Sequence, residues 1–274
     1  MLNNVLEVLS PAKLNLFLHV TGQRSNGYHE LQTVFQLLNW GDTLKFELSE
    51  TPGIRLAGNL EGIDQSENLI IRAANLLTLP DHIGVSITVN KIIPMGGGLG
   101  GGSSNAAVTM LGLNKLLTLD YSIDEMALMG ASLGADVPVF VRGHSAWAEG
   151  IGEELCPIDL PNRWFVIIYP NCHVSTQEIF TAAELTRNTP PITVSAFFDG
   201  AVHNDLQAVV EARYEPVRAA IKWLSARGSA MMTGSGACVF AAYDERESAE
   251  RVAEEAKGCF QAFVAEGISR YSIE

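Results

Sequence analysis

The segment PMGGGLGGGSSNAA, residues 94–107, is the strongest structural signal in the sequence. A strand is expected just before it, at 85–90, and the apolar run just after it, at 106–117, has helical periodicity. Glycines let a backbone approach an anion closely and turn its N–H groups toward it. The first turn of the following helix adds free N–H groups and a positive dipole end. The segment therefore predicts a phosphate-binding loop.

Two other known phosphate loops and a structureless linker are the alternatives for this segment. A Walker A loop ends in GK[ST], and no lysine follows these glycines. A dinucleotide-type GxGxxG can be traced through Gly98 and Gly100, but so many glycines match almost any spacing. A flexible Gly/Ser linker has a similar composition. Met95 and Leu99 inside the loop, and the apolar helix behind it, favour a fixed shape.

The sequence N-terminal to this loop predicts a β-rich region. Residues 12–20 alternate strictly and predict a half-buried strand, with Leu14, Leu16, Leu18 and Val20 on one face and Lys13, Asn15, Phe17 and His19 on the other. Two further strands are expected at 33–38 and 43–48, joined by a turn at 39–42. A helix is expected at 68–79.

The sequence after the loop predicts alternating helices and strands. SIDE at 122–125 resembles a capping box that opens a helix. Strands are expected at 139–143, 164–169 and 259–265, and a strand–glycine turn–strand at 231–243. Helices are expected at 245–257 and at 204–228, and the second of these is interrupted at Pro216. The periodicity typical of helices and strands weakens near 150–163, where Gly and Pro interrupt it. We therefore predict an α+β fold with two lobes, 1–155 and 156–274.

Composition limits the classes of protein. The 274 residues are 47% hydrophobic and 18% charged, as in a globular protein. The formal net charge of −13 disfavours nucleic acid and anionic membranes as partners, because both require clustered Lys and Arg. Four widely spaced cysteines without a CxxC pair predict reduced thiols and a cytoplasmic location. No targeting segment and no apolar run near the ~20 residues of a membrane helix are visible.

Four collinear blocks of sequence resemble the GHMP kinases, the family of galactokinase, homoserine kinase, mevalonate kinase and phosphomevalonate kinase. Besides the glycine loop, these are PAKLNLFLHVTGQRSNGYHELQTVFQLL at 11–38, ENLIIRAA at 67–74, LGADVPVFVRGHSAWAEGIGE at 133–153 and MTGSGACVF at 232–240. The resemblance covers most of the chain. It implies an N-terminal α/β lobe, a C-terminal ferredoxin-like lobe and an active site in the cleft between them.

The blocks most resemble the members that phosphorylate a CDP-linked methylerythritol. The resemblance implies that MgATP donates its γ-phosphoryl group to the 2-hydroxyl of this sugar alcohol, in the non-mevalonate route to isoprenoid precursors. The cofactors implied are ATP and Mg²⁺, and the partner is a small molecule, with the protein a monomer or weak homodimer. The alternatives are a GHMP kinase with another acceptor, such as homoserine or mevalonate, and a nucleotide-binding module without catalysis.

Lys13 and Asp136 match the two catalytic positions of the family. The resemblance implies that Asp136 accepts or orients the hydroxyl proton and that Lys13 orients Asp136 and stabilises charge near the acceptor oxygen. From local pattern alone, Lys13 would be a solvated lysine on a strand and Asp136 an ordinary loop aspartate.

The resemblance assigns the remaining site residues to the two substrates. The expected ATP-binding residues are Asn68, Lys91, Pro94, Met95, Gly96, Gly97, Gly98, Leu99, Gly100, Gly101, Gly102, Ser103 and Ser104. From pattern alone, Asn68 is a helix N-cap and Lys91 a solvated lysine. No protein ligand of Mg²⁺ can be assigned, although Ser103 or Ser104 could supply a hydroxyl.

The acceptor pocket is expected to recognise both ends of the CDP-linked substrate. Tyr28 and Phe180 match aromatic walls for cytosine, and His29 matches the residue that contacts its polar edge. The remaining residues that match substrate-contacting positions are Asn15, Thr176, Gly234, Ser235 and Gly236. From spacing alone, Tyr28 and His29 are a turn pair, Phe180 a core residue, and residues 234–236 a tight hairpin turn.

Overall fold

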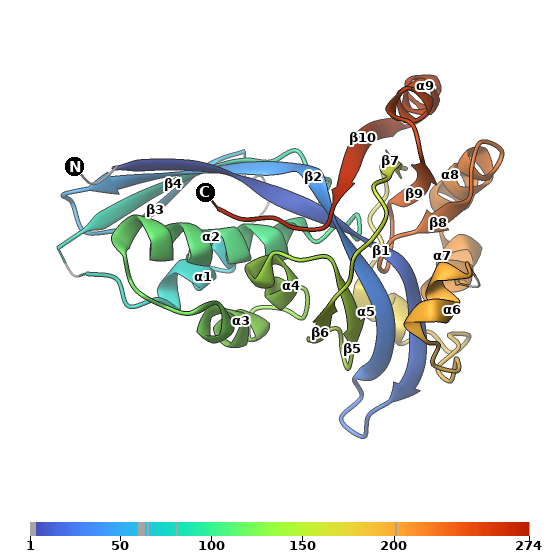
Figure 1. Ribbon diagram of the computed structural model, residues 1–274, viewed down its shortest axis with the longest axis horizontal. Helices are drawn as coiled ribbons and strands as arrows, with labels where there is room; N and C mark the ends of the chain where they lie inside the picture. The colour runs from blue at the N-terminus through green and yellow to red at the C-terminus, as the bar shows by residue number, and fades with distance from the viewer. Residues whose placement is uncertain (1–3, 60–63, 65, 81, 201, 274) are drawn as a thin grey trace.

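Two long antiparallel strands run through both lobes of the protein. They are β1 (Val5–Gln23) and β2 (His29–Ser49), seen in blue in the computed structural model, which describes residues 4–59, 64, 66–80, 82–200 and 202–273 (Figure 1). Their pairing shifts register at three places, between Pro11 and Lys13, between Asn15 and Leu18, and between Val20 and Gly22. Such bulges bend a strand pair strongly. The bent ribbon therefore carries residues from the first lobe into the second.

The other strands extend the sheet on both sides of this ribbon. The order is β3-β4-β2-β10-β7-β9-β8, and among the strands of the described residues only β3 and β4 pair in parallel. The bounds are Gly53–Gly58 for β3, Gly84–Asn90 for β4, Gln261–Ile268 for β10, Trp164–Tyr169 for β7, Val239–Tyr243 for β9 and Ala230–Met232 for β8. In addition, β5 (Ala146–Glu149) pairs with both β2 and β6 (Glu154–Pro157). The last strand, β10, thus links the two lobes through β2 and β7.

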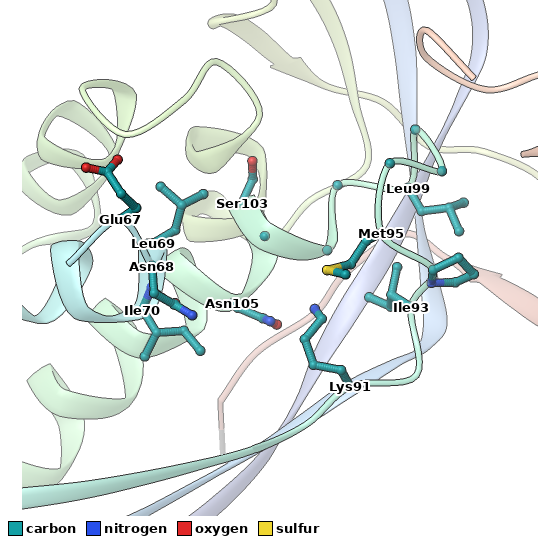
Figure 2. Close-up of a pocket in the computed structure, with 17 residues that line it drawn as sticks. Glu67, Asn68, Leu69, Ile70, Lys91, Ile93, Met95, Leu99, Ser103 and Asn105 are labelled. Atoms are coloured by element: carbon teal, nitrogen blue, oxygen red, sulfur yellow. The ribbon is translucent and has the colours of Figure 1, made fainter. Parts of the chain in front are cut away.

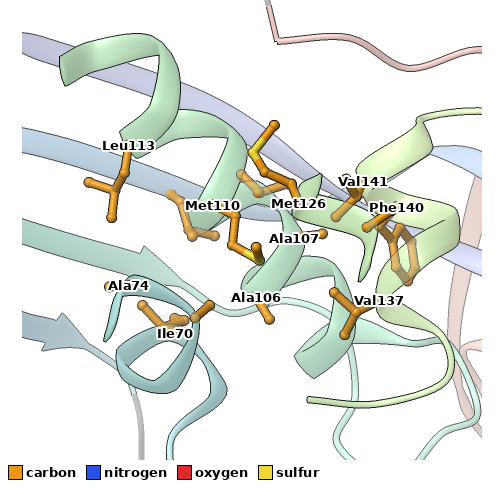
Figure 3. Packing of buried hydrophobic residues seen from close by; sticks show 14 of the residues in the cluster. Ile70, Ala74, Ala106, Ala107, Met110, Leu113, Met126, Val137, Phe140 and Val141 are labelled. Atoms are coloured by element: carbon orange, nitrogen blue, oxygen red, sulfur yellow. The ribbon is translucent and has the colours of Figure 1, made fainter. Parts of the chain in front are cut away.

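In the described part of the first lobe, four helices cover one face of the sheet (Figure 1). They are α1 (Leu69–Asn75), α2 (Gly101–Leu117), α3 (Ile123–Ala131) and α4 (Val137–Arg142). Figure 3 shows their apolar side chains meeting around α2, among them Ile70, Met110, Met126 and Phe140. Since α2 is buried along most of its length, the loop that precedes it is anchored to the centre of this core.

Among the described residues of the second lobe, five helices are present. They are α5 (Thr176–Phe180), α6 (Val194–Phe198), α7 (Asp205–Arg213), α8 (Glu215–Ser225) and α9 (Arg246–Ala256). The core of this lobe includes Leu18 and Val20 of β1 together with residues of β7, α7 and α8. The β1–β2 ribbon therefore contributes to both cores. The predicted division into 1–155 and 156–274 falls inside β6 and stays a prediction.

Several sequence-based predictions of secondary structure are confirmed. The capping box is present, because the Ser122 hydroxyl accepts from the Glu125 N–H and the Glu125 carboxylate accepts from the Ser122 N–H. The expected helix at 204–228 is divided into α7 and α8 beside Pro216. The strand–turn–strand at 231–243 corresponds to β8 and β9. The α+β class and the two-lobed arrangement are also as predicted.

Three local predictions were wrong. Residues 139–143 were expected to form a strand but belong largely to α4, whose residues 137–141 are all buried, so that no helical periodicity is visible. The expected turn at 39–42 is an irregularity within the continuous strand β2. Residues 12–20 are buried on both faces and not half-buried, because their apolar side chains pack into three different clusters of buried residues and Lys13, Asn15 and His19 are buried as well.

The four cysteines, Cys156, Cys172, Cys238 and Cys259, are free thiols, as expected. Within the described ranges, every helix is too short or too polar to cross a bilayer.

Candidate active site

The glycine loop has a fixed shape. Gly96, Gly98 and Gly100 have φ values of 66°, 74° and 72°, which side chains rarely adopt. A Cβ atom on Gly98 would lie 2.2 Å from the carbonyl oxygen of Thr233. The backbone N–H groups of Ala237 and Cys238 donate to the Gly96 and Gly97 carbonyls at 3.1 Å each. The loop is therefore clamped against the segment 233–238, which excludes the flexible-linker alternative.

The glycine loop lies between two cavities. The first has a volume of about 370 Å³ and is shown in Figure 2. It is lined by Glu67, Asn68, Leu69, Ile70, Lys91, Ile93, Pro94, Met95, Gly96, Gly97, Gly98, Leu99, Gly100, Gly101, Gly102, Ser103 and Asn105. The second has a volume of about 870 Å³, and Gly96, Gly98 and Gly100 line it as well. A ligand group on one side of the loop can thus lie close to a group on the other side.

The first cavity contains the N-terminus of α2. Gly100 is the N-cap, and neither a capping side chain nor an acidic residue occupies the first turn. The first N–H groups of an α-helix have no partner within the helix. Ser103 lines the cavity, whereas Ser104 is fully buried and hydrogen-bonded to the Ser10 hydroxyl at 2.8 Å. An anion bound here would meet backbone donors and one hydroxyl, that of Ser103.

Asn68 and Lys91 lie on opposite sides of the first cavity (Figure 2). Asn68 is the N-cap of α1, as local pattern predicted, and its side chain accepts a hydrogen bond from the Ile70 N–H at 2.9 Å. Lys91 is largely buried and ion-paired with Asp42, so it is not the solvated lysine that pattern alone suggested. Asp42 also accepts from two backbone N–H groups, at residues 92 and 93. Both predicted residues therefore border the cavity while stabilising its walls.

The second cavity is lined mainly by side chains from many parts of the chain. Its lining comprises Lys13, Asn15, Leu18, Asn26, Gly27, Tyr28, His29, Leu31, Thr33, Phe35, Gly96, Gly98, Gly100, Ala135, Asp136, Ile151, Gly152, His173, Val174, Ser175, Thr176, Gln177, Phe180, Thr181, Gly234, Ser235 and Gly236. Every residue that the sequence assigned to catalysis or to the acceptor substrate is in this set.

Lys13 and Asp136 form an ion pair where the second cavity meets the glycine loop. The Lys13 Nζ lies 3.2 Å from the Asp136 Oδ2, and the two side chains are 4% and 32% exposed. The Lys13 side chain is therefore buried, contrary to the solvated lysine that strand pattern suggested. Asp136 precedes α4 and makes no capping hydrogen bond with its side chain. This leaves a partly exposed carboxylate, held by a buried cation, facing the cavity.

Asn15 connects this pair to the fold. Its Oδ1 accepts from the Lys13 Nζ, and its Nδ2 donates to the Thr33 hydroxyl at 3.0 Å. The Thr33 hydroxyl in turn donates to the Phe17 carbonyl. The backbone N–H of Asn15 donates to the Thr233 hydroxyl at 2.9 Å. The orientation of the amide is therefore set by fixed partners, and Asn15 holds Lys13 in place.

Aromatic residues line the part of the second cavity around the end of the β1–β2 ribbon. Tyr28 is 60% exposed, whereas His29 is buried and packs on Phe180 with 5.1 Å between ring centroids. Arg187 donates to the His29 Nε2 at 3.0 Å. Burial and, second to it, the Arg187 charge lower the pKa of His29 from its ordinary value. Tyr28 thus offers a free aromatic face near a neutral imidazole and a second ring.

Hydroxyl groups and glycines form another part of the wall of the second cavity. The Thr176 and Ser235 hydroxyls are 2.7 Å apart, and Gly234 and Gly236 flank Ser235 with φ values of 56° and 89°. His173 lies against Gly96, where an added Cβ would be 2.4 Å from the His173 Nδ1.

Sequence reasoning missed some lining residues, notably Thr33, His173 and Gln177, and the more distant Arg187. Thr33 lies inside the block 11–38 but was assigned no role, and the other three stand in none of the quoted blocks. Only their contacts in the folded chain indicate a part in the site.

Two family models match the chain. The GHMP kinases N terminal domain matches residues 68–144, which include the glycine loop and Asp136. The GHMP kinases C terminal domain matches residues 192–262, which include the segment 233–238 that holds the loop.

Two curated relatives match nearly the whole chain. The 4-diphosphocytidyl-2-C-methyl-D-erythritol kinase of Hahella chejuensis is 47% identical, covering 100% of this chain and 97% of the relative. The enzyme of the same name from Marinobacter nauticus is 49% identical, covering 95% and 93%.

Solved structures share the same architecture. A crystal structure of 4-(cytidine 5'-diphospho)-2C-methyl-D-erythritol kinase superimposes with a TM-score of 0.86 at 32% identity, covering 96% of this chain and all of that one. A homoserine kinase from Cytophaga hutchinsonii superimposes with a TM-score of 0.68 at 18% identity, covering 98% and 96%. The second likeness concerns the fold alone.

Proposed function

The chain belongs to the 4-diphosphocytidyl-2-C-methyl-D-erythritol kinases, a branch of the GHMP kinase family, and we propose from that premise how its two cavities carry out the reaction. The γ-phosphoryl group of ATP passes to the 2-hydroxyl of the sugar alcohol, giving the 2-phosphate and ADP in the non-mevalonate pathway. The observation that carries the assignment of roles is the Lys13–Asp136 pair, placed beside a glycine loop that borders both cavities.

ATP binds in the first cavity in this proposal. Its phosphates lie along the glycine loop and the N-terminus of α2, where backbone N–H groups and the helix dipole favour negative charge. Asn68, Lys91, Pro94 and Met95 surround the remaining nucleotide. Ser104 contributes indirectly, since its hydroxyl is bonded to Ser10 and supports the first turn of α2.

The acceptor hydroxyl is activated from the second cavity. Asp136 accepts its proton as the new O–P bond forms and the bond between the γ-phosphorus and the β,γ-bridging oxygen breaks. An alcohol needs little prior deprotonation in a loose transition state, so orientation by Asp136 is a large part of its contribution. Lys13 offsets the charge of Asp136 and of the transferring group, and Asn15 keeps Lys13 aimed at both.

The donors around the first cavity fit Mg²⁺, which ATP-dependent kinases use. Mg²⁺ prefers oxygen ligands and commonly takes only one or two from the protein, the others coming from phosphates and water. Ser103 and Glu67 both line the first cavity. We propose Ser103 as the protein contact of the ion, because Ser104 is buried away from the cavity. When bound, the ion would neutralise charge on the phosphates.

The CDP group anchors the substrate at the far end of the second cavity. Tyr28 and Phe180 offer aromatic faces to a pyrimidine, and His29 lies beside both. Thr176, Ser235 and the glycines that flank Ser235 line the path toward Asp136 with hydroxyl and backbone donors.

The test is an acceptor panel. ADP release by the purified protein with MgATP is measured with 4-diphosphocytidyl-2-C-methyl-D-erythritol, homoserine, mevalonate or galactose, each supplied alone. Turnover with the cytidyl compound only would support the proposed roles of both cavities. Turnover with another acceptor would keep the Lys13–Asp136 pair but discard the roles of Tyr28, His29 and Phe180. ATP binding without any turnover would indicate a binding module.

Location and assembly complete the proposal. Four free thiols suit a reducing compartment, so we propose a cytoplasmic enzyme. Both cavities are formed within one chain, which is consistent with a monomer or a weak homodimer. Light scattering across a concentration series measures the assembly state directly.

A further inference from the structure

Arg187 joins the two sides of the second cavity at its aromatic end. Its Nε donates to the His29 Nε2 at 3.0 Å. Its Nη2 donates to the carbonyls of Phe180 and Ala182 at 2.9 and 2.7 Å, and its Nη1 to the carbonyl of Leu185 at 3.1 Å. One guanidinium therefore ties β2 to the segment that carries Phe180. The walls contributed by His29 and Phe180 are held in a fixed relation.

The contact with Arg187 determines which ring nitrogen of His29 carries a proton. A guanidinium stays protonated in proteins and can only donate hydrogen bonds. The His29 Nε2 must therefore be an unprotonated acceptor, and a neutral imidazole then carries its proton on Nδ1. Because Nε2 is occupied, Nδ1–H is the ring group left to contact a ligand in the cavity that His29 lines.

We propose that Arg187 is a positioning residue for base recognition, which holds His29 as the Nδ1–H tautomer so that its ring offers one hydrogen-bond donor to the pyrimidine. This inference rests on the proposed function, in which the pyrimidine of the CDP group occupies this end of the cavity. Arg187 does not line the cavity, and it acts through His29 and the Phe180 backbone.

A fixed donor that meets N3 of the base distinguishes the two pyrimidines. Cytosine presents two adjacent acceptors, O2 and N3, on its pairing edge. Uracil presents an N3–H donor in the middle of the same edge, and two opposed donors leave a polar group unpaired. A histidine free to exchange tautomers, or to become charged, would lose part of this discrimination. Arg187 thus acts on specificity without contacting the base.

The other charged groups near His29 do not offer it an alternative partner. Glu30, its neighbour on β2, is bound by Arg24 through two hydrogen bonds of 2.5 and 3.1 Å. Glu153 lies 3.9 Å from Arg24. From the segment after α5, Arg187 is the charged side chain that meets the ring. His29 is therefore influenced mainly by Arg187 and by burial.

The first experiment needs no substrate. The protonation of both His29 ring nitrogens is followed by ¹⁵N NMR from pH 5 to 8 in the full-length protein, with His29→Gln used to assign the signals. We expect a neutral ring with the proton on Nδ1 at pH 7, and in Arg187→Gln a mixture of tautomers with a raised pKa. Finding the proton on Nε2 in the unmodified protein would overturn the proposal.

The second experiment measures base discrimination. We expect Arg187→Gln to raise the KM for the CDP-linked acceptor roughly tenfold, with kcat and the KM for ATP changed less than about twofold. In the same variant, the inhibition constants of CMP and UMP against the CDP-linked acceptor should become more nearly equal. Arg187→Lys, which keeps a cationic donor, should restore part of it. Arg213→Gln removes an exposed pair with Glu184 and serves as the control.

The outcomes separate this inference from the function on which it rests. No turnover of the CDP-linked acceptor by the unmodified protein would refute the proposed function, while the NMR result still decides the tautomer. Turnover combined with unchanged CMP and UMP inhibition in Arg187→Gln would overturn the role of Arg187 alone. A variant that merely loses thermal stability, with the His29 tautomer intact, would also contradict it.

Discussion

The two cavities share the glycine loop but are built from different materials. The first is formed largely by the backbone of one continuous segment, residues 93–103, with a few side chains around it. The second is formed by side chains that lie between positions 13 and 236 of the sequence. A site made of glycine backbone tolerates few substitutions, because any added side-chain atom occupies the space of the ligand or of a neighbouring segment. A site made of side chains can change its substrate through single substitutions.

This difference in construction matches a difference in task, since the first cavity is proposed to bind ATP and the second to recognise the acceptor. Every GHMP kinase must hold ATP phosphates, and backbone N–H groups can do so without regard to the acceptor. Members of this branch must also recognise the diphosphocytidyl group of their acceptor. The comparison predicts that changes in the second cavity affect either turnover or acceptor binding, and that changes in the loop affect ATP first.

The largest expected effect comes from Asp136. In Asp136→Asn the amide keeps the shape of the carboxylate but is a poor proton acceptor, so kcat should fall by about 10²–10⁴-fold. The KM for ATP should change little, because Asp136 lies in the second cavity only. Steady-state kinetics with both substrates varied measures this. Asp124→Asn, at an exposed carboxylate paired with Arg142, is the control. Undiminished turnover would remove Asp136 from the chemistry.

A methyl group on the loop should act on ATP. In Gly98→Ala the Cβ would lie 2.2 Å from the Thr233 carbonyl, and the residue has a φ of 74°. Strain of this kind should lower kcat/KM for ATP about 10- to 100-fold. Gly102→Ala should do less, since its Cβ meets only Leu69 Cδ1, at 3.4 Å. ATP titrations of both variants test the comparison. Equal losses would show that the shape of the loop is not limiting.

The two cavities also differ in how well the sequence predicts them. The first cavity was largely predictable, because strand, glycine loop and helix are adjacent in the chain. Ser104 is the exception. Two neighbouring serines look alike in sequence, and only the helix phase, which turns Ser104 toward Ser10, separates them.

The second cavity was predictable only by resemblance. Strand alternation predicted that Lys13 would be solvated, yet its side chain is buried beside Asp136, which lies more than a hundred residues later in the chain. The helix α4, which Asp136 precedes, was expected to be a strand, because the run 137–141 is apolar and buried on all sides. His173 and Arg187 carry no motif at all. Contacts between distant segments, which local periodicity cannot express, assemble this part of the site.

Tyr28 tests the specific end of the second cavity. It is 60% exposed, so Tyr28→Ala should leave the stability of the fold nearly unchanged. Loss of a stacking face should raise the KM for the CDP-linked acceptor about tenfold, while kcat falls less. The KM for ATP should stay the same. Phe198→Ala, at another exposed aromatic residue outside both cavities, is the matched control. An unaltered acceptor KM would place the pyrimidine elsewhere.

The smallest expected effect lies on β1 beyond both cavities, at His19. This side chain is 2% exposed, and neither ring nitrogen has a hydrogen-bond partner. Burial first, and then the nearby His203, lower the pKa of His19, while Asp205 opposes them. The unfolded chain therefore binds a proton near the ordinary pKa that the folded chain does not bind. The free energy of unfolding should therefore fall as the pH drops through the pKa of the unfolded chain. Once the pH is also below the pKa of the folded chain, the total loss is about 1.4 kcal/mol for each unit by which folding lowers the pKa.

His19→Leu removes the titrating group and the two unpaired nitrogens while nearly keeping the volume. The variant should match or exceed the parent in stability, and its loss of stability between pH 7.5 and 5.5, measured by urea unfolding, should be smaller. The KM values for both substrates should remain unchanged, because His19 lines neither cavity. An unchanged pH slope would assign the acid sensitivity to other groups. A raised acceptor KM would mean that a change at this position of β1 reaches the second cavity. It would contradict the prediction that His19 affects stability alone.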